Sequence, residues 1–457
     1  MKTHVSLLTA VLVGAGIVSL PAQADNLLSL YHEAVQADTT YLGAQADTRV
    51  AREMKPQALA RLLPNVSFSG NNFRQTINRP SQTYEIGGQS ITYNPPTEKY
   101  NTYTYALGVT QPLFRADAYV AWKQSQEVVK GAEADLLWAG QQIGTRVSEA
   151  YFKVLLTEAN LEVTKAQRDA YLTQLDYAQK AFQTGAGTRT DIDEARSQLD
   201  LAAAQTIELQ YQLNYARDEL KVLVDRPLTP LARLNPDRIQ LVSPDPDRLE
   251  DWVQKAEEVN PRLNALRASV EAANLQVKKA LSGHLPTVDL VAQHVNNQEL
   301  TFVQSDQYND KYRGNLYGLR VDVPIFSGGA TSSQVRQAGA QLDKARLQLE
   351  EGRRAIGLMV RKEFEGVAQG LHWVHAYEQA VKSAEQALAS TRKGFMGGTR
   401  TTIDIIIAEQ NLANAKRDLN RGRCDYVTSR LRLLAMVGEL NEAEITRING
   451  WLEEVPK

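Results

Sequence analysis

The chain has 457 residues, a formal net charge of −2 at neutral pH and a single cysteine, Cys424. The near-neutral charge gives no reason to expect a nucleic-acid partner, because such partners select basic surfaces, and one cysteine excludes an intrachain disulfide. No nucleophile, histidine and carboxylate occur together in a supporting context. His372 and His375 lie one turn apart, but no third metal ligand accompanies them. We therefore predict neither an enzyme nor a cofactor or metal site.

Residues 1–24 have the features of a secretory signal. Lys2 supplies a positive start, residues 5–20 are apolar, and Ala22-Gln23-Ala24 fits the small-x-small cleavage pattern. Cleavage after Ala24 would give a mature protein that starts at Asp25. Further along the chain no apolar run approaches the roughly 20 residues of a spanning helix. Two alternatives remain: a protein that is soluble outside the inner membrane, or a β-barrel.

The first half of the mature chain, residues 25–224, predicts a helix, two strands, a very long helix and a shorter helix. The segment 27–62 is rich in helix formers, and residues 116–181 contain no proline. A helix over residues 116–181 would be about 100 Å long, which points to coiled-coil or helical-tube packing. The strands are expected at about 64–77 and 100–113, separated by a polar, turn-rich loop.

A proline-rich linker, residues 225–250, separates this half from a second one, residues 251–437, and a tail follows at 438–457. The second half predicts strands at about 286–298 and 312–325, again with a polar loop between them, and a long helix over about 331–392. The halves are copies. Gly185, Thr188 and Asp191 recur as Gly398, Thr401 and Asp404, at a constant offset of about 213 residues. The chain is therefore one structural unit, duplicated and fused.

The strand regions favour a membrane barrel over a small soluble hairpin. Tyr103, Tyr105, Leu107 and Val109 alternate with small and polar residues, the pattern of outer-membrane strands. Known outer-membrane barrels need at least about eight strands, so four per chain cannot close a pore. Three chains would supply 12. The predicted fold is mainly α with a small β part: as a trimer, a 12-stranded transmembrane β-barrel continued by a long α-helical barrel.

These residues resemble the TolC family of outer-membrane efflux and secretion channels. The most specific motif is Gly398-Thr399-Arg400-Thr401-x-Ile403-Asp404, echoed by Gly185 and Thr190-Asp191-Ile192, and the resemblance covers essentially the whole mature chain. It implies a homotrimer in the Gram-negative outer membrane that contacts lipid and extends into the periplasm. It also implies two partners: a periplasmic adaptor, and an inner-membrane ABC or resistance-nodulation-division pump. The chain would be a passive exit duct for type I protein secretion, multidrug efflux or both.

The resemblance also implies the site residues. The repeated turns would form the periplasmic tip, where Asp404 gives an acidic ring of three at the pore constriction, bordered by Ile407. Arg400, Thr190 and Asp191 would latch neighbouring coiled coils. Phe395 replaces a frequent aromatic hydroxyl, so one latch contact should be missing or replaced by packing. The tip turns at Gly185 and Gly398 are candidate adaptor contacts.

Two alternatives stay open. Asp191 and Asp404 could be carboxylates that satisfy the first-turn amides of their helices and nothing more. The whole chain could also be a periplasmic coiled-coil adaptor or scaffold of an export complex. Such adaptors usually carry one helical hairpin and a β-rich remainder, rather than two duplicated units.

Overall fold

The structure is a computed structural model that describes residues 24–303 and 306–453; apart from Ala24, the predicted signal lies outside this range. The α-helices are α1 (Leu27–Ala37), α2 (Thr39–Ala60), α3 (Ala116–Gln183), α4 (Arg189–Val224), α5 (Leu249–Val259), α6 (Pro261–Leu281), α7 (Ala330–Met396), α8 (Thr402–Met436) and α9 (Glu442–Asn449). The strands are β1 (Asn65–Ile77), β2 (Gln82–Ile86), β3 (Gln89–Tyr93), β4 (Glu98–Phe114), β5 (Arg233–Leu234), β6 (Thr287–Val303), β7 (Asp306–Asp322) and β8 (Leu452–Glu453). Short 3₁₀ turns occur at Pro236–Arg238 and Ser282–His284.

The chain divides into two compact units, and each draws on both repeats. The strand unit comprises Gly43–Ala139 and Lys255–Leu358. The tip unit comprises the described parts of Met1–Leu42, Gly140–Gln254 and Met359–Lys457. The two very long helices, α3 with 68 residues and α7 with 67, contribute to both units.

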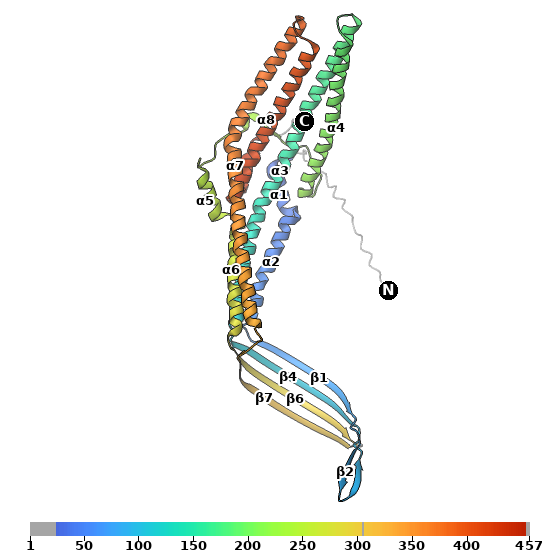
Figure 1. Ribbon diagram of the computed structural model, residues 1–457, viewed down its shortest axis with the longest axis vertical. Coiled ribbons are helices and arrows are strands. Elements are labelled where there is room, and N and C mark those ends of the chain that lie inside the picture. The colour runs from blue at the N-terminus through green and yellow to red at the C-terminus, as the bar shows by residue number, and fades with distance from the viewer. Residues whose placement is uncertain (1–23, 304–305, 454–457) are drawn as a thin grey trace, which may run out of the picture. The chain divides into compact units, whose positions relative to one another are not determined.

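The strand unit contains one four-stranded antiparallel sheet in the order β1-β4-β6-β7 (Figure 1). The two repeats join in the middle of this sheet, where β4 of the first pairs with β6 of the second, Tyr103 opposite Gln298. Every residue of β1 except Ile77 is exposed, so neither face of this strand is covered within the chain. This strand therefore contributes no buried core to the sheet.

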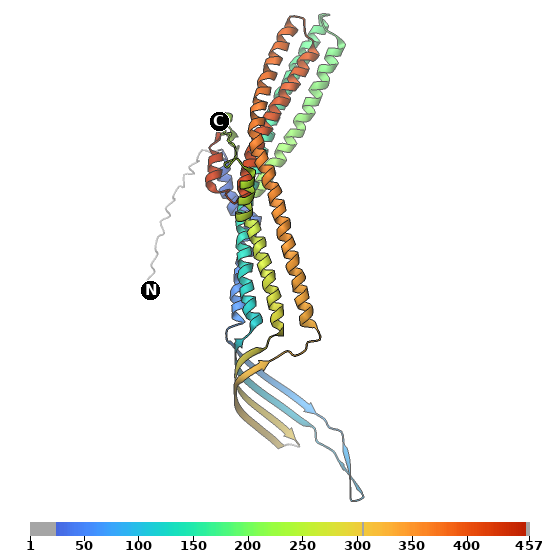
Figure 2. The ribbon, with the colours of Figure 1, turned by 60° about the vertical axis from the view of Figure 1, so that its left-hand side comes forward.

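Three features of this sheet differ from the sequence-based expectation. The segment between β1 and β4 is not a plain loop but carries the hairpin β2–β3, which lies beyond the ends of these strands (Figure 2). The loop expected between β6 and β7 is also largely strand, since the two pair as far as Val303 and Asp306. β7 ends at Asp322 instead of continuing to Ile325, because Pro324 has no N–H to donate to a ladder.

Four helical segments pack side by side in the strand unit. Arg52 of α2 donates to Glu133 of α3 at 2.9 Å, and Arg262 of α6 forms an ion pair with Asp135 of α3 at 2.8 Å. Gly352 of α7 lies directly against α6, where an added Cβ would come within 2.5 Å of a leucine side chain. The Leu266 side chain would have to move to admit a side chain at this position.

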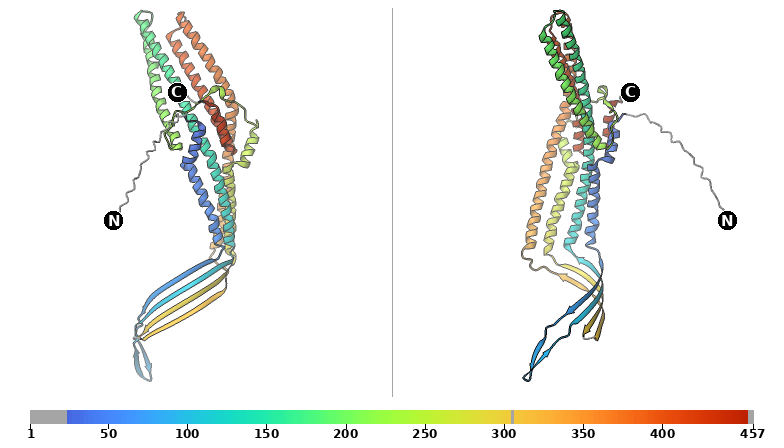
Figure 3. Two further views of the ribbon diagram at one scale, coloured as in Figure 1. Left: turned by 180° about the vertical axis from the view of Figure 1, so that it is seen from behind. Right: turned by 90° about the vertical axis from the view of Figure 1, so that its right-hand side faces the viewer.

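The tip unit holds two helical hairpins, α3 with α4 and α7 with α8, which run side by side (Figure 3). Its core includes α1, whose Leu27 and Leu30 are fully buried, and Tyr151 of α3. The Tyr151 hydroxyl donates to the carbonyl of Ala232 in the linker at 2.7 Å. The linker and the tail are tied together, because β5 pairs with β8.

The predicted first helix is broken at Asp38. This residue caps α1, and its carboxylate accepts a hydrogen bond from the Tyr41 N–H at 2.7 Å. Arg146 of α3 donates to the same oxygen at 2.8 Å. The break satisfies amide groups at the helix junction, as the side chain of a residue at a helix start does.

Candidate functional site

Two turns of the same construction join α3 to α4 and α7 to α8. Gly185 and Gly398 have φ angles of +78° and +74°, in the left-handed region that favours glycine. Beyond Gly185, the Ala186 N–H donates to the Ala181 carbonyl at 2.9 Å, the long bond of a Schellman motif. The N–H of Thr399 makes the equivalent bond at the second turn. Each glycine therefore ends a long helix and reverses the chain.

The helix that follows each turn begins with a capping box. At the start of α4, the Thr188 hydroxyl accepts from the Asp191 N–H at 3.2 Å, and the Asp191 carboxylate accepts from the Thr188 N–H at 2.9 Å. At the start of α8, Thr401 and Asp404 repeat these bonds at 3.3 and 2.8 Å. Both aspartates thus satisfy first-turn amides, the simpler of the two roles considered from the sequence.

Capping occupies only part of the Asp404 carboxylate. Its Oδ2 accepts from the Thr401 N–H and hydroxyl, and its Oδ1 lies 3.6 Å from a guanidinium nitrogen of Arg400. The hydrogen bonds from Thr401, with the nearby positive charge of Arg400, hold the pKa of Asp404 below its ordinary value of 3.8. Asp404 therefore stays negatively charged at neutral pH, with Oδ1 available to a further cation.

The remaining predicted site residues lie around the same turns. Thr190 is exposed in the first turn of α4, and Ile407 is exposed three positions after Asp404 on α8. The Phe395 ring meets Tyr177 of α3 edge-on, with centroids 5.1 Å apart and an interplanar angle of 67°. Phe395 thus joins the two hairpins by packing.

Several contacts between the hairpins were not predicted. Arg417 of α8 donates to Thr164 and Gln167 of α3 at 3.1 and 3.4 Å. Within the second hairpin, Arg392 of α7 forms an ion pair with Glu409 of α8. Charges at helical spacing were visible in the sequence, but nothing in it indicates which helices become neighbours.

A shared apolar cluster lies below the turns. It contains Tyr171, Leu175, Ala178, Ile192, Ala195, Ala202 and Ile406. Ile406 of α8 brings the second hairpin to the first. Beside the cluster is a cavity of about 500 Å³ that is lined by residues of α3, α7 and α8. The hairpins are therefore held together by apolar packing that leaves some space between them.

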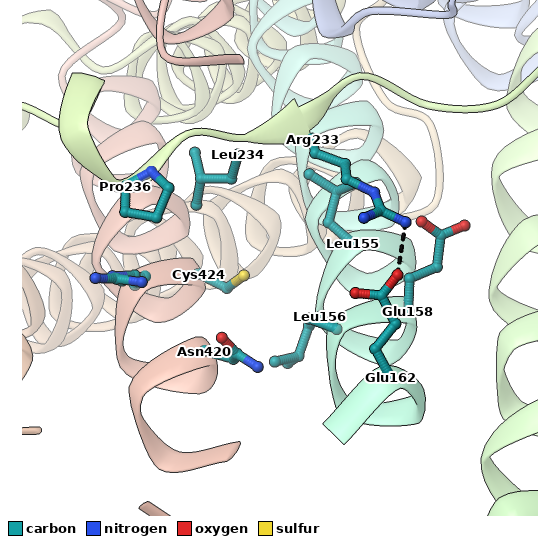
Figure 4. Close-up of a pocket in the computed structure, with 11 residues that line it drawn as sticks. Leu155, Leu156, Glu158, Glu162, Arg233, Leu234, Pro236, Asn420 and Cys424 are labelled. Atoms are coloured by element: carbon teal, nitrogen blue, oxygen red, sulfur yellow. Dashed lines mark hydrogen bonds and ion pairs between the residues drawn. The ribbon is translucent and has the colours of Figure 1, made fainter. Parts of the chain in front are cut away.

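A smaller pocket, of about 190 Å³, lies between α3, α8 and β5 (Figure 4). Leu155, Leu156 and Leu234 line it together with Cys424, and an ion pair between Arg233 and Glu162 lies at its side. Burial raises the pKa of the Cys424 thiol to about 12. The thiol is therefore protonated at neutral pH and acts as a small apolar side chain.

Within residues 24–303 and 306–453, no three His, Cys, Asp or Glu side chains gather closely enough to hold a metal ion. In the same part of the chain, no helix combines the length and the apolar character needed to cross a membrane.

A family model described as outer membrane efflux protein matches residues 30–224 and 252–439, one stretch in each repeat. The chain belongs to the outer membrane efflux protein family. It is 31% identical over 421 residues to the alkaline protease secretion protein AprF of Pseudomonas aeruginosa, covering 92% of this chain and 85% of AprF. It is 29% identical to the outer membrane protein TolC of Escherichia coli, covering 98% and 89%. The crystal structure of the outer membrane protein VceC from Vibrio cholerae matches with a TM-score of 0.74 at 22% identity, covering 90% of this chain and 96% of VceC.

Membership confirms the resemblance to TolC and the fold class: duplicated helical hairpins with a small sheet. This outer membrane efflux protein is an exit duct of the Gram-negative outer membrane that extends into the periplasm. Its family consists of outer membrane channels rather than enzymes. TolC-like channels act with adaptors and inner-membrane pumps.

Proposed function

We propose that the protein forms a homotrimeric duct that is closed at its helix turns and opened by a periplasmic adaptor and an inner-membrane pump. The sheet carries the trimer proposal. Among the described residues β1 and β7 each pair on one side only. An open sheet edge is too costly to persist in lipid, where no water satisfies its N–H and C=O groups. Three four-stranded sheets joined edge to edge would close a 12-stranded barrel.

An apolar stripe on α4 supports the same assembly. Ile207, Tyr211 and Val222 are four and eleven positions apart, so they lie on one face of α4. Tyr211 and Val222 are 71% and 77% exposed. Their counterparts in the second repeat, about 213 positions later, are Asn420, Cys424 and Ala435 on α8. Cys424 and Ala435 are 7% and 0% exposed, because the chain itself covers that helix. In the trimer a second copy would cover α4 in the same way.

The constriction would lie on α8. Asp404 and Ile407 are three positions apart and so lie on one face of the helix. Around a threefold axis they would form an acidic ring and an apolar ring. Three carboxylates held close together attract cations and bind a multivalent cation more strongly than one carboxylate does.

The latch and the adaptor contacts would lie on the turns themselves. Arg400 is more than half exposed, and its ion pair with Asp404 is long, at 3.6 Å. Its guanidinium can therefore also bind a neighbouring hairpin. Thr190 and Asp191 would take part in the same latch. Phe395 would contribute packing alone. The exposed turns at Gly185 and Gly398 would meet the adaptor.

The names of two relatives support one class of cargo. AprF and the proteases secretion protein PrtF of Dickeya chrysanthemi, the latter 29% identical and covering 96% of PrtF, carry protease secretion in their names. We therefore favour protein export by a type I system with an ABC pump. The similarity to TolC keeps multidrug efflux, with a resistance-nodulation-division pump, as the second candidate.

Single-channel conductance in a planar bilayer tests the duct and its constriction. Asp404→Asn removes the ring's charge but keeps an amide oxygen for the capping box. Asp191→Asn makes the same change in the matching box of the first repeat. We expect Asp404→Asn to lose cation selectivity and block by a trivalent cation, and Asp191→Asn to retain both.

Each outcome has a distinct meaning. Equal effects of the two variants would show that the charge acts through helix capping and would rule out the acidic ring. Unchanged selectivity in both would place the constriction elsewhere. Folded protein that never conducts would contradict the duct and favour the adaptor or scaffold reading.

A further inference from the structure

Asp25, the residue after the expected cleavage point, is bound at every polar group. Asp25 is only 6% exposed, although it is the second described residue. Its N–H points at two acceptors, the Pro230 carbonyl at 3.0 Å and the Thr229 hydroxyl at 3.1 Å. Its carbonyl accepts from the Ala232 N–H at 2.9 Å. Its carboxylate accepts from the Arg226 guanidinium at 2.6 and 3.1 Å and from the Thr229 N–H at 2.8 Å.

Among the described residues, the charges of this cluster do not balance. Arg226 also binds Glu33 of α1 through both carboxylate oxygens, at 2.7 and 3.0 Å. One guanidinium thus serves two carboxylates, those of Asp25 and Glu33, and the group carries a net charge of −1. A partly buried cluster is more stable when its charges cancel. One more positive charge beside Asp25 would complete it.

The Asp25 nitrogen also has fewer hydrogens than acceptors around it. A peptide nitrogen has one hydrogen, yet two acceptors lie within 3.1 Å of the Asp25 nitrogen. An α-ammonium group has three hydrogens and one positive charge. It would serve the Pro230 carbonyl and the Thr229 hydroxyl with separate hydrogen bonds and would neutralise the cluster.

We propose that the Ala24–Asp25 bond is cut during export and that the new α-ammonium of Asp25 is the missing charge that locks the N-terminus to the linker. The cut is a hydrolysis by a leader-specific peptidase. Water supplies the oxygen of the Ala24 carboxylate, and the Asp25 nitrogen takes up protons to become an ammonium. Ala22-Gln23-Ala24, the small-x-small pattern, lies directly before this bond. Processing thus completes a structural site that joins α1 to the residues after α4.

Amine labelling with mass spectrometry tests this site on protein purified from outer membranes. Near neutral pH an acylating reagent prefers an α-amine to lysine, because their ordinary pKa values are about 7.7–8.0 and 10.4. We expect the N-terminal residue to be Asp25, and its amine to react at least roughly tenfold more slowly in the native protein than in urea, since reaction requires local opening.

Variants distinguish the lock from simple burial. Thr229→Val keeps the shape but removes one acceptor, and Arg226→Gln removes the guanidinium; both should speed native labelling severalfold. Arg233→Gln, which breaks the exposed ion pair with Glu162 in the same linker, is the matched control and should leave the rate unchanged. An N-terminus at another residue, equal rates in native and urea-treated protein, or equal effects of Thr229→Val and Arg233→Gln would each overturn the proposal.

Discussion

The substitution Arg115→Gln tests how the sheet is tied to the start of α3. Arg115, the residue between β4 and α3, binds Asp289 of β6 through two parallel hydrogen bonds, at 3.0 and 2.7 Å. The Asp289 side chain is 1% exposed, and its other partner, Arg320 of β7, lies 3.5 Å away. Arg115→Gln would leave a covered carboxylate with this single distant partner.

The expected loss in the free energy of unfolding lies between two limits. Breaking a fully buried ion pair costs about 3–5 kcal/mol, and an exposed pair contributes about 0–1 kcal/mol. Arg115 is itself 35% exposed, so the pair is only partly buried although the Asp289 side chain is 1% exposed. We therefore expect a loss of about 2 kcal/mol in the free energy of unfolding.

Urea unfolding in detergent, followed by tryptophan fluorescence, measures this loss. Arg320→Gln is the control, and its loss should stay below about 1 kcal/mol because that pair is longer and more exposed. Combining Arg115→Gln with Asp289→Asn should restore much of the stability, since no carboxylate is then left unpaired. Equal losses for Arg115→Gln and Arg320→Gln, or no recovery in the double variant, would refute the reasoning.

Three further predictions concern the turns. Thr401→Val removes a hydrogen bond to Asp404 and lets the pKa of Asp404 rise towards 3.8. Cation selectivity is lost as the pH falls through this pKa, so it should disappear at a higher pH in the variant than in the parent. An unchanged midpoint in a conductance titration would count against the assignment. Gly398→Ala puts a Cβ at φ +74° and should cost about 1 kcal/mol in urea unfolding, whereas Gly397→Ala, which meets only ordinary contacts, should stay within about 0.5 kcal/mol. Phe395→Ala removes an aromatic contact of about 0.5–1.5 kcal/mol and should lengthen channel openings in bilayer recordings; shorter openings would contradict its place in the closed state.

The sequence predicted what depends on local chemistry. Gly185 and Gly398 mark their turns because only glycine adopts that backbone angle without cost, and the threonine and aspartate that follow each glycine mark a helix start. The absence of proline over residues 116–181 indicated a helix that runs from Ala116 to Gln183. These features need no knowledge of distant parts of the chain.

Most of the features that were missed depend on distant parts of the chain. The hairpin β2–β3 is the exception: Tyr84 and Ile86 alternate with polar residues before the Gly87-Gly88 turn, as Ile91 and Tyr93 do after it, and this local signal was overlooked. The contact of Tyr177 with Phe395 joins residues on two helices, and helical periodicity identifies a face without naming its neighbour. Two-residue strands such as β5 and β8 are too short to show any alternation.

The unequal burial of α4 and α8 has a consequence for biogenesis. A newly exported monomer carries Tyr211 and Val222 uncovered, together with two open sheet edges, so it presents the surfaces from which aggregates grow. If copies assemble as proposed, we expect such a chain to need protection from aggregation until they meet. Its abundance should therefore be limited by the rate of encounter and by proteolysis of unassembled subunits. Strong overexpression would then yield degraded or insoluble chains before it yields more channels.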